Sequence, residues 1–143
     1  MSNNKTRPPS SAPIHGYSGK PLHQKMGLKE GMVCLVINQP ENYAELLSAA
    51  EGVIFRKRSN VADVVHLFCA TRAVLEKKID SAISKTKPGG ALWVSWPKKS
   101  SAMFIDLTED QLREVILPTG WVDVKVCAVD ENWSGLKFMK RRT

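Results

Sequence analysis

The length, composition and charge of this chain exclude several classes of protein. Its 143 residues, 43% of them hydrophobic, suffice for one globular domain that folds without disulfides or metals. No apolar run approaches the ~18 residues of a membrane-spanning helix. The net charge of +7 lies at the two ends, because residues 1–27 and 137–143 each carry +4 and residues 28–136 carry −1. We therefore expect no basic face on the folded body, and only weak, non-specific contact with polyanions through the termini.

The cysteines and the N-terminal residues indicate a cytoplasmic protein. Cys34, Cys69 and Cys127 each lie in an apolar run and lack zinc-type spacing, so we expect buried thiols in a reducing compartment. The first residues, MSNNKTRPPSSAP, lack the apolar core of a signal peptide. We predict a cytoplasmic monomer with no metal and no cofactor.

Three regions follow one another along the chain. Residues 1–13 are polar and rich in proline, which predicts a disordered basic tail. Residues 14–30 form an N-terminal segment that we expect to pack on the domain through five apolar side chains: Ile14, Tyr17, Leu22, Met26 and Leu28. Residues 31–141 are predicted to form a single α/β domain.

Strands and helices alternate within this domain. In chain order we expect a strand at 32–37, a helix from Pro40 to Gly52, strands at 53–55 and 62–70, a helix from Thr71 to Lys85, a strand at 91–96 after the turn Pro88-Gly89-Gly90, a helix from Thr108 to Gly120, and strands at 121–130 and 136–140. The helix at 108 has the clearest start, since Thr108 and Gln111 have capping-box spacing. Right-handed crossovers predict a Rossmann-like three-layer sandwich with strand order 2-1-3-4-6-5, mostly parallel, with an antiparallel C-terminal hairpin.

Two resemblances follow from these patterns. The turn and strand KPGGALWVS, followed by a helix and the terminal hairpin, resemble the second half of the class I S-adenosylmethionine (SAM)-dependent methyltransferase fold over residues 60–141. The stretches GYSGKPLHQKMGL, ALWVSWPKKSS, DLTED and VDVKVCAVDENWSGLKF also resemble a family of small bacterial proteins of unknown function. These resemblances imply a truncated methyltransferase-like fold and a bacterial, cytoplasmic protein, without a mechanism.

The expected cofactor turn of a methyltransferase is altered here. A Gly-rich turn normally follows the first strand, whereas VINQPENY (36–43) contains no glycine and includes Pro40. After the second strand, Arg56-Lys57-Arg58 replaces the acidic residue that would bind ribose hydroxyls. The sequence therefore predicts that SAM does not bind.

Polar residues near three predicted strand ends suggest a different site. Ligands of open α/β sheets bind outside the carboxyl ends of the strands. Those ends present Asn38, Gln39, Thr71, Arg72, Trp96, Lys98, Lys99, Ser100 and Ser101. Three cations beside hydroxyls, amides and an indole make a candidate anion or nucleotide-fragment site; a solvated polar rim is the structural alternative.

His66, within VVHLF, is interpreted as a core histidine satisfied by hydrogen bonding, with a general base as the functional alternative.

We interpret the chain as a non-catalytic binding or interaction module for a small anionic molecule or a nucleotide fragment. The first alternative is a divergent SAM-dependent methyltransferase. The second alternative is a nucleic-acid accessory protein that acts through its basic termini.

Overall fold

The computed structural model describes residues 19–142. The helices are α1 (Leu22–Met26), α2 (Tyr43–Leu46), α3 (Arg72–Ser84) and α4 (Glu109–Ile116), followed by the 3₁₀ helix η2 (Leu117–Thr119). The strands are β2 (Val33–Ile37), β3 (Ile54–Arg56), β4 (Ala62–Phe68), β5 (Thr86–Pro97), β6 (Trp121–Ala128) and β7 (Trp133–Lys140). The predicted tail at 1–13 lies outside the described residues, so its disorder stays a prediction.

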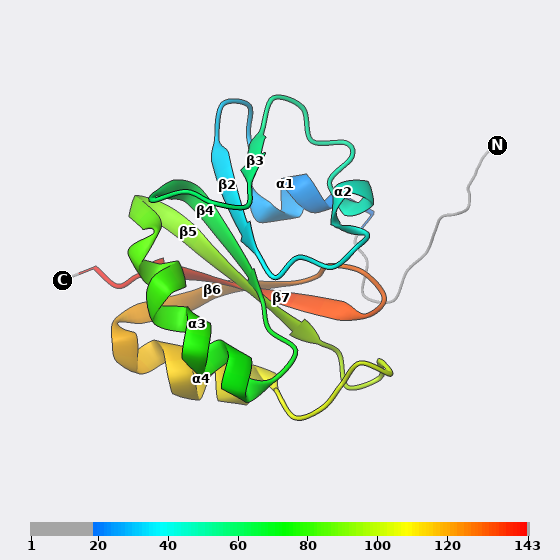
Figure 1. Ribbon diagram of the computed structural model, residues 1–143, viewed down its shortest axis with the longest axis vertical. Helices are drawn as coiled ribbons and strands as arrows, with labels where there is room; N and C mark the ends of the chain where they lie inside the picture. The colour runs from blue at the N-terminus through cyan, green and yellow to red at the C-terminus, as the bar shows by residue number, and fades with distance from the viewer. Residues whose placement is uncertain (1–18, 143) are drawn as a thin grey trace.

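The six strands form one sheet in the order β3-β2-β4-β5-β7-β6 (Figure 1). Strands β3, β2, β4 and β5 are parallel, and β7 runs antiparallel to both β5 and β6. This is the predicted topology, and the predicted α/β fold class is confirmed. Alternating strands and helices with right-handed crossovers left few other arrangements.

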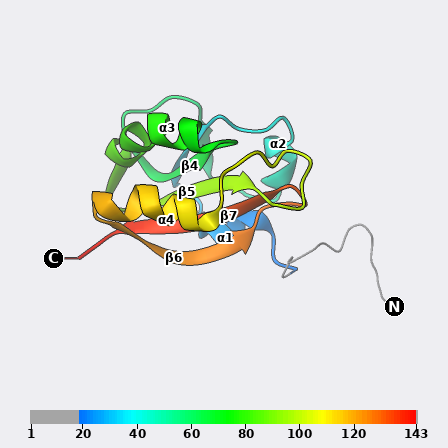
Figure 2. The ribbon, with the colours of Figure 1, turned by 90° about the horizontal axis from the view of Figure 1, so that it is seen from below.

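The sheet has an apolar core on each face. Figures 1 and 2 show α3 and α4 on one face and α1 on the other. On the first face, Leu75 and Ile79 of α3 and Leu112 of α4 pack against the sheet. The second face is covered by α1, by Tyr43 of α2 and by Leu47 just after it. The second cover is thinner, because α1 and α2 are helices of one turn.

The predicted helix starts at Thr71 and Thr108 are present. Thr71 Oγ accepts a hydrogen bond from Val74 N at 3.2 Å, and Thr108 Oγ accepts one from Gln111 N at 3.3 Å. Each hydroxyl thus satisfies an otherwise unpaired N–H in the first turn of its helix. The reciprocal half of the capping box is missing, because the buried Gln111 side-chain oxygen has no hydrogen-bond partner.

Two predicted boundaries were wrong. The helix expected from Pro40 to Gly52 is only the single turn α2, because Tyr43 and Leu47 are the only residues between 40 and 52 that are fully buried. A short helix needs buried side chains that pack against the rest of the domain, since an isolated short helix is marginal in water.

The turn Pro88-Gly89-Gly90 lies within β5, where the register with β4 shifts and Gly89 takes a φ of +80°. The sequence signature marked a bulge rather than the start of a strand.

The N-terminal segment contacts the domain where it is described. Leu22, Met26 and Leu28 are buried in the core of the second face, and Lys25 Nζ donates to the carbonyl of Ala128. Ile14 and Tyr17 lie outside the described residues. Within residues 19–142, no helix combines the length and the apolar character needed to cross a bilayer. The cytoplasmic location stays a prediction.

Candidate functional site

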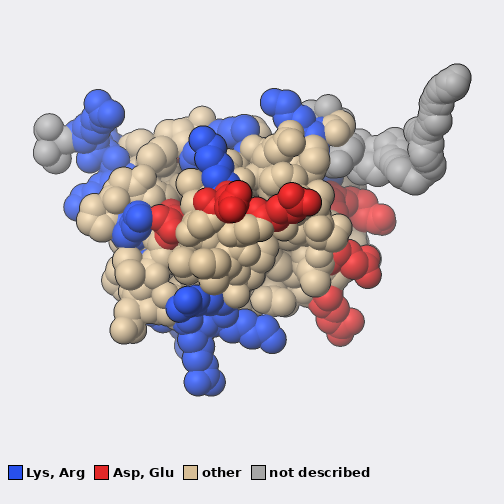
Figure 3. Space-filling model, turned by 90° about the horizontal axis from the view of Figure 1, so that it is seen from above, with Lys and Arg blue, Asp and Glu red and all other residues tan. Residues whose placement is uncertain are grey.

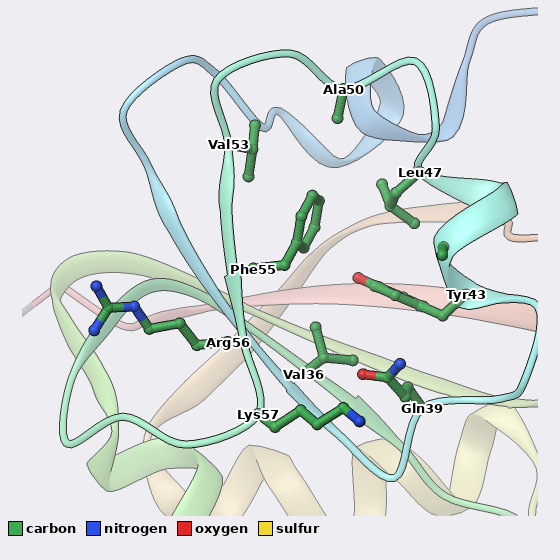
Figure 4. A pocket seen from close by; sticks show the side chains of 10 residues that line it. Val36, Gln39, Tyr43, Leu47, Ala50, Val53, Phe55, Arg56 and Lys57 are labelled. Carbon is green, nitrogen blue, oxygen red and sulfur yellow. The ribbon is translucent and has the colours of Figure 1, made fainter.

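A cavity of about 360 Å³ opens between α2 and the edge strand β3. Its walls come from β2 (Val36), from the β2–β3 connection (Gln39, Tyr43, Ala44, Leu47, Ala50, Val53) and from β3 with the residue after it (Phe55, Arg56, Lys57). Figure 4 shows the Phe55 ring in the middle of this group, with Tyr43 and Leu47 facing it. The volume lies in the range of small-molecule sites, and two rings on apolar walls suit a planar heterocycle. The cavity also lies near the carboxyl ends of β2 and β3, where open α/β sheets bind ligands.

The turn after β2 forms without glycine. Asn38 has a φ of +60°, the left-handed conformation that glycine usually supplies and that asparagine tolerates better than other residues. Its side-chain amide donates to the carbonyl of Phe68 at 3.4 Å. The sharp turn that the sequence was expected to lack is therefore present, and the absence of glycine does not exclude a ligand here.

A chain of buried hydrogen bonds supports the cavity wall. The Tyr43 hydroxyl lies 3.0 Å from His66 Nδ1, and His66 Nε2 lies 2.7 Å from Ser95 Oγ. Because both neighbours are hydroxyls, a neutral imidazole donates to one and accepts from the other in either tautomer. The rings of Phe55 and Phe68 meet Tyr43 edge-on. These contacts fix the Tyr43 ring as a rigid side of the cavity.

His66 is a core residue, as the first interpretation held, and burial keeps it neutral. Its side chain is fully buried on β4, and burial lowers its pKa to about 3 because the charged form loses its hydration. Burial also raises the pKa of Tyr43, and it raises the pKa of the Cys34 and Cys69 thiols to about 12. A thiol with so high a pKa is a poor nucleophile. The chain of hydrogen bonds therefore holds the Tyr43 ring in place, and the Cys34 and Cys69 thiols stay protonated at neutral pH.

The predicted site residues fall into three groups. Asn38 and Gln39 follow β2, and only Gln39 lines the cavity. Thr71 caps α3, while the Arg72 guanidinium pairs with Glu76 at 3.0 Å and Glu114 at 2.9 Å.

The free N–H groups at the start of a helix can bind an anion. At the start of α3, the backbone N–H of Arg72 donates to the Asp106 carboxylate at 3.1 Å. A carboxylate of the chain itself therefore interacts with this end of the helix.

The third group lies beyond the end of β5. Trp96, Lys98 and Lys99 share an open depression of about 430 Å³ with Glu109, Asp110 and Arg113 of α4, so its charge is mixed. Ser100 is exposed, and Ser101 Oγ donates to the Asn132 side chain at 2.9 Å. Gln39 lines the cavity between α2 and β3, whereas Trp96, Lys98 and Lys99 line the depression beside α4, and anion binding by the three groups stays a prediction.

The surface shown in Figure 3 carries both basic and acidic side chains. Figure 3 shows Lys and Arg in several separate groups on one face, with Asp and Glu near its middle and along one side. Contact of the termini with polyanions stays a prediction, since residues 1–18 lie outside the described part of the chain. Within residues 19–142, no group of three or more His, Cys, Asp or Glu side chains could hold a metal ion.

Sequence reasoning missed most of the cavity. Tyr43, Leu47 and Phe55 had been assigned only to a helix or a strand, and no local pattern marks them as ligand-binding. The sequence did offer one indication, the basic run Arg56-Lys57-Arg58. It was interpreted only as the replacement of an acidic ribose-binding residue and was not connected to a cavity.

Comparison with solved structures finds methyltransferases. The chain is similar to DhpI in its complex with S-adenosylhomocysteine (SAH), with a TM-score of 0.57 and 13% identity over 86% of this chain and 83% of that chain. It is similar to a SAM-dependent methyltransferase from Aquifex aeolicus, with a TM-score of 0.57 and 17% identity over 87% and 90% of the two chains. A third likeness is to the magnesium protoporphyrin IX methyltransferase ChlM from Synechocystis PCC 6803 with bound SAM, with a TM-score of 0.54 and 12% identity over 83% and 74%. Neither a family model nor a curated protein matches the sequence.

These likenesses show a methyltransferase-like, Rossmann-like fold, and they overturn the interpretation of a non-catalytic binding module. The solved structures include chains with SAM or SAH bound and cover most of this chain. The earlier interpretation depended on the missing glycine, whereas Asn38 has the left-handed conformation that glycine usually supplies. Membership of the small bacterial family stays a prediction.

Proposed function

We propose that this chain is a divergent SAM-dependent methyltransferase that binds its cofactor in the cavity between α2 and β3. The observation that carries the proposal is the position of that cavity, which reaches the carboxyl ends of β2 and β3 at Gln39 and Lys57 in a fold similar to that of methyltransferases. When bound, SAM supplies a methyl group from a sulfonium centre.

The residues that line the cavity suit the adenine and several polar groups of the cofactor. Phe55 and Tyr43 offer ring faces and edges to an adenine, and Leu47 and Val53 exclude water around it. The Gln39 amide can donate to and accept from the polar groups of the cofactor. One feature does not fit the usual arrangement, because no carboxylate lines the cavity to accept hydrogen bonds from the ribose hydroxyls.

Titration calorimetry with SAH and SAM tests the proposal. We expect saturable binding of both compounds at one site per chain. Ala50 lines the cavity and points into it in Figure 4, so Ala50→Trp should fill the space and abolish binding. Its neighbour Ala49 is exposed and does not line the cavity, so Ala49→Trp should bind as the wild type does.

Two outcomes would refute the proposal. The first is an absence of saturable binding by the wild-type protein at millimolar ligand. The second is an equal loss of affinity in the two tryptophan variants, which would place the binding site elsewhere.

A further inference from the structure

The rim of the cavity between α2 and β3 is positively charged. Arg56 and Lys57 line it, and neither Asp nor Glu is among the lining residues. Both cations are exposed, and none of the ion pairs found within residues 19–142 includes either of them. Two cations without a carboxylate partner favour a ligand that brings its own negative charge to this end of the cavity.

The two cations point in different directions. Figure 4 shows Lys57 lying along the edge of the cavity with its ammonium toward the Gln39 side chain. Arg56 extends away from the other labelled side chains. Lys57 is therefore the cation placed to contact a ligand. Arg58 is exposed and does not line the cavity, so it is a neighbouring charge that serves as a control.

The chemistry of the proposed cofactor identifies what Lys57 would bind. SAM and SAH each carry one anionic group, the carboxylate of the amino-acid moiety, while their ribose hydroxyls are neutral. An ammonium forms its strongest hydrogen bonds with a carboxylate, and charge-assisted pairs exceed neutral ones.

We infer that Lys57 binds the amino-acid carboxylate of the cofactor. This contact would lie at the edge of the cavity beside Gln39, toward which the Lys57 ammonium points. The inference rests on the proposed function and assigns the Lys57 ammonium the role of selecting the charged end of the ligand.

A comparison of SAH with its decarboxylated form tests the role of Lys57, because the two compounds differ only in the carboxylate. Calorimetric affinities are measured for the wild type, Lys57→Gln and Arg58→Gln. Both side chains are exposed, so both variants should fold. We expect the wild type and Arg58→Gln to prefer SAH about fivefold, the size of an ion pair partly screened by water. Lys57→Gln should bind the two compounds equally.

The possible outcomes separate this inference from the proposed function. A preference for SAH that persists in Lys57→Gln overturns the inference while leaving the cofactor site in place. A preference lost equally in both variants also overturns it, because it would reflect the general field of the rim. Failure of the wild type to bind either compound would overturn the proposed function and the inference together.

Discussion

Acid should destabilise this protein through one buried side chain, His66. Its folded-state pKa is lowered to about 3, whereas an unfolded chain has the ordinary value near 6.5. At a pH between these two pKa values, the imidazole is protonated in the unfolded state and neutral in the folded state. The free energy of unfolding therefore falls as pH falls through this window, and it is restored as pH rises above 6.5.

The size of this effect follows from the two pKa values. Lowering the pH from 7 to 5 should remove about 2 kcal/mol from the free energy of unfolding, since each pH unit below the unfolded pKa is worth ~1.4 kcal/mol. Asp63 contributes little over this range. Its pKa is lowered by hydrogen bonding to Lys87 and to the Val33 N–H, so its contribution is lost only below about pH 4.

Urea unfolding at pH 7 and pH 5 measures the effect, with His66→Gln as the matched variant. A glutamine amide can still donate to and accept from Tyr43 and Ser95, but it does not titrate. We expect the wild type to lose about 2 kcal/mol more than the variant over this range. An identical pH dependence in both proteins would refute the reasoning. If His66→Gln fails to fold, the imidazole ¹⁵N shifts of the wild type decide, because a charged ring at pH 5 contradicts the prediction.

Three further predictions concern stability and are checked by urea unfolding. Gly90→Ala should cost about 2 kcal/mol or more, because its Cβ would lie 2.6 Å from the Asp63 carbonyl oxygen in β4. The neighbouring Gly89→Ala has room and should lose only ~1 kcal/mol through its positive φ, so equal losses would contradict the steric argument. Thr108→Ala should lose ~1 kcal/mol with its cap, and an unchanged midpoint would show that the cap contributes nothing. Arg113→Ala removes the ion pair with Asp123 that joins α4 to β6, together with the pair with Glu109 inside α4, and should cost ~1 kcal/mol at low salt; a loss independent of salt would indicate packing instead.

The sequence was sufficient where short-range chemistry decides the structure. Thr71 and Thr108 cap their helices because each hydroxyl reaches an N–H three residues away, and that geometry depends on little else. The strand order was predictable for a related reason. Alternating strands and helices, together with the handedness of the crossovers, leave few ways to arrange six strands in one sheet.

The same reasoning failed where a residue depends on distant neighbours. The pattern from Pro40 to Gly52 is helical by propensity, yet only Tyr43 and Leu47 are fully buried there, with Leu46 partly buried against the same core, and the helix stops after one turn. In β6, Val124 and Val126 look like core residues in an alternating strand. They are more than half exposed in β6, an edge strand that also bulges between Asp123 and Lys125.

The sequence by itself thus determined the fold class, the helix caps and the order of the sheet, since these depend on local geometry and chain connectivity. Only the tertiary structure decided where a ligand could bind. The cavity requires Tyr43 and Phe55 to meet across two elements, and the Tyr43 ring is held by His66 and Ser95, which lie 23 residues further on and another 29 beyond that. No local pattern encodes such a meeting, because it depends on which distant side chains share the same buried space.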